Sequence, residues 1–136
     1  MVNPYKEKQR ITDETIRKIL IQLKGLFMSK KLKEAEELVE NTLYDGYKHA
    51  DLYYMGGEIK KALSKFFLEI YTHIYKELYK EAEAYYLQAL TFQVHSPYVY
   101  QSLGLVYINL NSHKRAIPLL KHFTDKIVRS FYRKES

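Results

Sequence analysis

The chain has 136 residues, enough for one small domain with a buried core, and it contains no cysteine, which excludes a disulfide framework and a thiolate metal site. Its net charge of +6 and isoelectric point near 9.3 favour an acidic partner, a membrane surface or nucleic acid. Because it lacks both an apolar signal core at the start and a run of about 18 apolar residues, we expect a cytoplasmic protein without a membrane span.

Apolar residues recur every three or four positions along most of the chain, which is the spacing of α-helices and not of strands. Residues 1–11 are predicted to be a flexible tail, and residues 12–136 a single domain. The spacing predicts helices at about 12–29, 32–44, 50–78, 80–93, 97–110 and 113–132.

The stretch 50–78 contains no proline and is predicted to form one long helix, with Gly56 and Gly57 as the point where it would break. Two shorter helices are the alternative. Two repeat registers fit this stretch. Leu52, Met55, Gly56 and Ile59 resemble the start of a helical repeat at its front end, and Phe66 and Ile70 do so at its back end.

The last two predicted helices carry a repeat pattern, W-x2-L-G-x2-Y followed by A-x3-F, with Tyr in place of Trp. Its positions are occupied by Tyr100, Leu103, Gly104, Tyr107, Ala116 and Leu120. Ala82 and Tyr86 form the A-x3-F pair again, 34 positions before Ala116 and Leu120. By these residues the chain resembles the tetratricopeptide repeat (TPR) family, whose period is about 34 residues.

The resemblance implies an all-α fold, a short right-handed TPR-like α-solenoid of about six antiparallel helices, with protein binding as its function. Gly104 and Ala116 would lie where paired helices approach most closely. Ala35 starts a similar pair, but 47 positions before Ala82 instead of 34, so we expect an irregular array.

In the TPR family the first helix of each repeat lines a concave groove, along the stripe that is not used for packing. In the last repeat this stripe is Tyr98, Gln101, Leu105 and Ile108; one period earlier it would be Ser64, Phe67, Tyr71 and Ile74, and in the first repeat Arg17, Leu20, Lys24 and Phe27. The predicted partner-binding groove therefore consists of Arg17, Lys24, Phe67, Tyr71, Ile74, Tyr98, Gln101 and Leu105.

Such a groove suits another protein or a peptide with apolar anchors and an acidic end. The alternative is that the chain's own tail or a second copy of the chain covers these side chains.

Charge is distributed unevenly along the second half of the chain. Residues 84–112 contain no Asp, Glu, Lys or Arg but many tyrosines, which is typical of the centre of an interface or of a buried middle repeat. Residues 114–136 carry seven Lys or Arg against two acidic residues. Within them, Lys121, Arg129 and Arg133 are interpreted either as a solvated outer face or as a basic patch for an acidic surface.

These patterns predict a protein-protein interaction module, an adaptor or chaperone-like scaffold. A structural subunit that forms a homodimer through the uncharged Tyr-rich region is the alternative, and a basic RNA-associated helical protein is the third hypothesis. No RNA-binding fingerprint favours nucleic acid. No enzyme activity, metal or cofactor is expected, because the five histidines lack the i, i+4 pairing of a helical zinc site and no Gly-rich phosphate loop is present.

Overall fold

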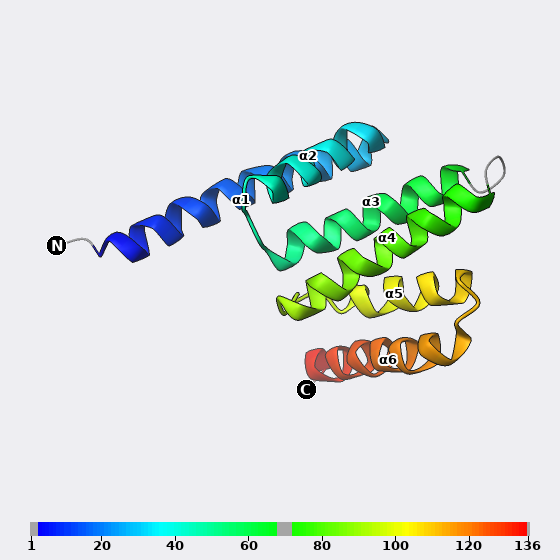
Figure 1. The fold of residues 1–136 in the computed structure, drawn as a ribbon. Coiled ribbons are helices and arrows are strands. Elements are labelled where there is room, and N and C mark those ends of the chain that lie inside the picture. Colours follow the sequence, from blue (N-terminus) through cyan, green and yellow to red (C-terminus); the bar gives the residue numbers. More distant parts are fainter. Residues whose placement is uncertain (1–2, 68–71, 136) are drawn as a thin grey trace.

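The computed structural model describes residues 3–67 and 72–135, and in these ranges it contains six α-helices and no strand (Figure 1). The predicted all-α fold is confirmed. The helices are α1 (Pro4–Met28), α2 (Leu32–Tyr44), α3 (Ala50–Phe67), α4 (Thr72–Thr91), α5 (Tyr98–Asn109) and α6 (His113–Glu135). Successive helices run antiparallel, so that α1 with α2, α3 with α4 and α5 with α6 form three stacked hairpins (Figure 1).

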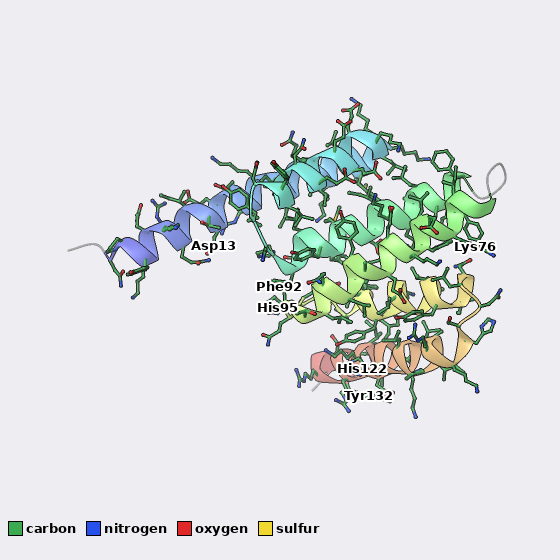
Figure 2. The ribbon with its side chains drawn as sticks, viewed as in Figure 1. Asp13, Lys76, Phe92, His95, His122 and Tyr132 are labelled. Atoms are coloured by element: carbon green, nitrogen blue, oxygen red, sulfur yellow. The ribbon has the colours of Figure 1, made fainter. Side chains whose placement is uncertain are left out.

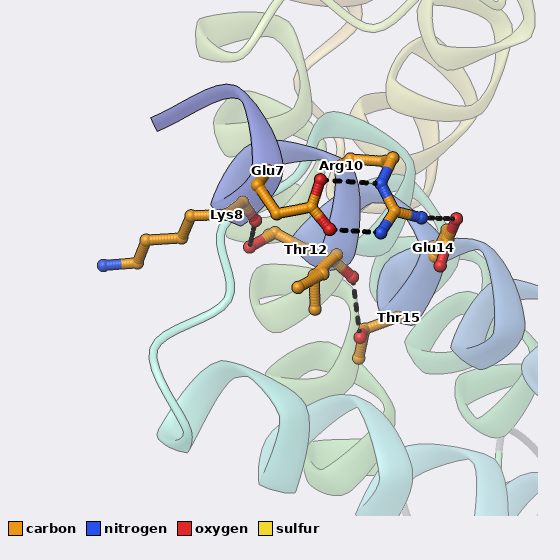
Figure 3. Close-up of polar contacts among 7 residues, drawn as sticks. Glu7, Lys8, Arg10, Thr12, Glu14 and Thr15 are labelled. Carbon is orange, nitrogen blue, oxygen red and sulfur yellow. Dashed lines mark hydrogen bonds and ion pairs between the residues drawn. The ribbon is translucent and has the colours of Figure 1, made fainter. Parts of the chain in front are cut away.

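The first helix begins at Pro4, so the predicted tail is wrong from this residue onward. The Asn3 side chain accepts a hydrogen bond of 2.9 Å from the backbone N–H of Tyr5, and Pro4 occupies the first turn, where its missing N–H costs nothing. Arg10 pairs with Glu7 and Glu14 on the exposed surface (Figure 3). These turns extend past the other helices (Figure 1). The boundary of the single domain stays a prediction.

The prediction of one long helix at 50–78 is wrong, since α3 and α4 are separate helices that pack side by side. Gly56 and Gly57 do not break α3 but lie where it approaches α4 most closely. A Cβ atom on Gly57 would lie 2.5 Å from the Tyr86 ring, and one on Gly56 would lie 2.7 Å from the Tyr85 ring. Only glycine allows this approach.

The last hairpin makes the same contact, because a Cβ atom on Gly104 would lie 2.7 Å from Leu120. Tyr86 and Leu120 are one repeat period apart, as predicted, but their glycine partners Gly57 and Gly104 are 47 positions apart. The extra residues therefore lie between Gly57 and Ala82. They lengthen α3 and α4 to 18 and 20 residues, whereas α5 has 12.

Two apolar clusters form the core. One lies among α1 to α4 around Leu23, Val39 and Ile59, and the other joins α4, α5 and α6 around Tyr86 and Leu103. Among the helices that the structure describes, none combines the length and the apolar character that crossing a membrane requires.

Lys60 is the buried charge that ties three helices together. From α3, its Nζ atom lies 2.7 Å from Glu36 of α2, 2.9 Å from Glu81 of α4 and 3.5 Å from Glu40. Burial alone would lower the pKa of Lys60, but the hydrogen bonds to Glu36 and Glu81 outweigh it and raise the pKa. Burial would likewise raise the pKa of Glu36, yet Lys60 holds it below its ordinary value.

Replacing a small buried residue on the helices that contact Gly57 and Gly104 with a large one should separate the paired helices. Ala82→Trp and Ala116→Trp are each expected to lower the free energy of unfolding by about 1 to 3 kcal/mol or more, since both alanines are fully enclosed. Thermal melts check this, with exposed Ala84→Trp on α4 as the control. Melts of the two buried variants that match the parent would contradict this helix register.

Lys60→Met should lower the free energy of unfolding by about 2 kcal/mol, because Glu36 then stays partly buried without its cation. The depressed pKa of Glu36 contributes stability that is present above the ordinary glutamate pKa and is lost as the pH falls through that range. Urea unfolding at neutral and acid pH should therefore show that acidification lowers the free energy of unfolding less for Lys60→Met than for the parent. Exposed Lys65→Met is the control, and equal stability of both variants would refute the buried cluster.

Candidate partner-binding surfaces

A hollow of about 320 Å³ lies where the first helices of the hairpins meet. We call it the groove. Its lining comes from α1, α3 and the segment before α5, and consists of Arg17, Leu20, Ile21, Lys24, Asp51, Tyr54, Met55 and Ser96. It thus combines an apolar floor with two cations and one carboxylate.

The first-repeat part of the predicted groove is present here, since Arg17 and Lys24 are exposed and line the hollow with Leu20. The middle part is misplaced. Phe67 and Ile74 are half-buried and do not line the groove; Phe67 lines another hollow, beside Leu32 and Leu63. Tyr71 lies outside the described residues.

The error has one physical cause, the longer α3–α4 hairpin. In the second helices, equivalent residues such as Ala82 and Ala116 are one repeat period apart. In the first helices α3 and α5, the equivalent residues Gly57 and Gly104 are 47 positions apart. Moving back by 47 positions from Tyr98 and Gln101 leads to Asp51 and Tyr54, which do line the groove. The spacing between Gly57 and Gly104 was the sequence signal that could have identified Asp51 and Tyr54 as groove residues.

On α5, Tyr98 lies close to Tyr54 of the lining, whereas Gln101 and Leu105 are not part of the lining. Tyr98 is half exposed, with its ring centroid 5.4 Å from that of Phe123, while Leu105 is exposed and Gln101 half-buried. Their role in binding stays a prediction.

Tyr54 connects the two parts of this surface. Burial and the charge of Glu58 raise the pKa of Tyr54 to about 12, while hydrogen bonding to Ser102 and Ser96 acts in the opposite direction. Its hydroxyl therefore lies between α3 and the start of α5 and stays protonated at neutral pH.

A buried polar network fixes the spacing of α3 and α5 beneath the groove. One Glu58 carboxylate oxygen accepts hydrogen bonds from the hydroxyls of Tyr86, at 2.6 Å, and Ser102, at 2.7 Å. The Lys61 ammonium donates to the Ser102 hydroxyl at 3.2 Å and lies 3.5 Å from Glu58. Because every member has partners, the network holds the helices in one arrangement.

The uncharged segment 84–112 contributes part of the core and part of the surface. Tyr86 and Tyr107 are buried, and Tyr85 and Tyr100 are half-buried. Phe92, at the end of α4 in Figure 2, and Tyr98 remain exposed. Self-association through this segment stays a prediction, as does RNA binding.

The predicted basic patch lies on α6. Lys121, Arg129 and Arg133 are exposed, on the same helix as Tyr132, which points away from the other helices (Figure 2). In the part of the chain that the structure describes, no three His, Asp or Glu side chains are grouped so as to hold a metal ion.

No family model matches the chain, and no curated protein matches it. Among solved structures, the crystal structure of MamA is similar at 17% sequence identity and a TM-score of 0.38, over 94% of this chain and 87% of that chain. This likeness is too distant to say what the protein binds.

Proposed function

We propose that the protein is an interaction module, an adaptor or chaperone-like scaffold, that binds a peptide segment of another protein in the groove. The observation that carries this proposal is the lining of the hollow by apolar, aromatic and basic side chains from α1, α3 and the segment before α5, together with the polar network that connects α3 to α5. Such a surface is rigid before the partner arrives, so binding loses little conformational entropy.

The lining defines the chemistry of the ligand. Leu20, Met55 and Tyr54 offer an apolar floor, and the thioether of Met55 adapts to side chains of different shape. Arg17 and Lys24 outnumber Asp51, so the α1 side favours an acidic residue or a terminal carboxylate. Tyr98 extends the surface with an exposed aromatic anchor.

The arrangement supports binding more than catalysis. The lining offers a single carboxylate, Asp51, together with the cations Arg17 and Lys24. Glu58, further along α3, already accepts hydrogen bonds from Tyr86 and Ser102. A general base needs a lone pair that is available to the substrate.

Peptides selected from a random library on the intact protein should contain apolar anchors next to acidic residues. Arg17→Glu with Lys24→Glu is expected to weaken the selected peptides about tenfold or more in calorimetry, because it removes both cations from the groove. Lys6→Glu with Lys8→Glu makes the same charge change on exposed turns of α1 and serves as the control. Equal affinities for the two double variants would contradict the groove.

Tyr98→Ala should weaken the same peptides by about 2 kcal/mol without a comparable loss of stability, since half of this side chain is exposed. Calorimetry and a thermal melt of one preparation test both statements. A variant that unfolds early and binds no more weakly per folded molecule would show that Tyr98 is a packing residue only.

A further inference from the structure

The last hairpin has an apolar face on which the described part of the chain places no helix. Its exposed side chains are Leu105 and Ile108 of α5 and Ile117 and Val128 of α6, which are between 36% and 65% exposed. We call these four residues the end seat. Apolar side chains on a face that no described helix covers need an explanation.

Inside the chain, the equivalent face of the previous hairpin holds a helix. The residues 34 positions before Ile117 and Val128 are Glu83 and Val94. Glu83 lies close to Tyr107 of α5, and Val94 packs against the core cluster that contains Val99, Leu103 and Val106 of α5. The first hairpin, α1 with α2, likewise packs against α3. The end seat is therefore the third instance of a surface that has received a helix twice.

A second copy of this chain does not supply that helix. The residues of α1 that correspond to Val99, Leu103 and Val106 lie 81 positions earlier and are Lys18, Gln22 and Gly25. Two are polar and one has no side chain, so α1 lacks the apolar stripe that α5 uses. Pairing α6 with α6 of another copy would bring together two segments that each carry seven basic and two acidic residues.

The charges around the end seat specify a different occupant. On the α5 side, residues 98–112 contain no charged side chain. On the α6 side, Lys114 and Lys121 lie about one turn before and after Ile117 on the exposed surface. A helix that packs here meets apolar side chains in the middle and positive charge along one edge.

We propose that the end seat binds an amphipathic helix of another protein, with apolar residues spaced i, i+4, i+7 as in Val99, Leu103 and Val106, and acidic residues along the edge that faces α6. None of the four end-seat residues lines the groove, so the two surfaces differ. Basic residues along α6 attract such a helix, and the apolar contacts hold it.

The test uses the full chain and two stapled helical peptides with the sequence of residues 97–111. In the chain this segment docks on α4, and Tyr107 comes close enough to Glu83 for that carboxylate to raise the Tyr107 pKa. Glu83 is equivalent to Ile117. One peptide replaces Tyr100 and Tyr107 with Glu, and the other replaces them with Lys. By fluorescence anisotropy the Glu peptide should bind at least about tenfold more tightly than the Lys peptide.

Ile117→Lys with Val128→Lys should abolish binding of the Glu peptide, while Arg17→Glu with Lys24→Glu should leave it unchanged, which separates this surface from the groove. Asn41→Lys with Thr91→Lys adds the same charge at exposed sites and is the control. Circular dichroism melts should show all variants folded.

Equal binding of the two peptides, binding that survives the end-seat variant, or no binding of either peptide would overturn the proposal. Sedimentation velocity of the parent should show a monomer over the micromolar range. Association that the end-seat variant abolishes would instead assign the seat to a second copy. Flotation with phosphatidylserine vesicles, lost in the same variant, would assign it to a membrane surface.

Discussion

The close contact between a glycine of one helix and a large side chain of the next sets the geometry of the second and third hairpins. Gly57 against Tyr86 and Gly104 against Leu120 allow the paired helices to approach to a distance that no larger residue permits. Once these contacts are fixed, the faces that remain on α3 and α5 are determined. The positions of Tyr54 and Tyr98 next to the groove follow from this register.

Polar contacts then select one arrangement of neighbouring hairpins. Apolar packing alone would tolerate small shifts of one hairpin against another, because it is not directional. The hydrogen bonds of Glu58 to Tyr86 and Ser102 and the contacts of Lys60 with Glu36 and Glu81 connect α2, α3, α4 and α5 in specific positions. Buried charges of this kind add little net stability but penalise alternatives that leave them unpaired.

Much of the fold could be predicted from the sequence because helix periodicity and small residues at close contacts are local signals. The positions of Gly104, Ala116 and Ala82 were predicted from the repeat pattern and lie where that pattern requires. The split between α3 and α4 was predicted only as the alternative, since residues 50–78 keep a helical spacing throughout and contain no proline. The start of α1 was missed although Asn3 followed by Pro4 is a sequence signal for the beginning of a helix, and the contact of Asn3 with Tyr5 confirms that start.

Arg17 and Lys24 of the predicted groove line the hollow, whereas Phe67 and Ile74 do not, and the reason for the misplaced middle part is again the register of the glycines. If Asp51 and Tyr54 stand between α1 and α5, nuclear Overhauser effects should connect the Tyr54 ring to protons of Ser96 and Ser102, and these signals should shift when a selected peptide is added. Contacts from Tyr98 to Phe67 instead, with Tyr54 signals unaffected by the peptide, would contradict the account.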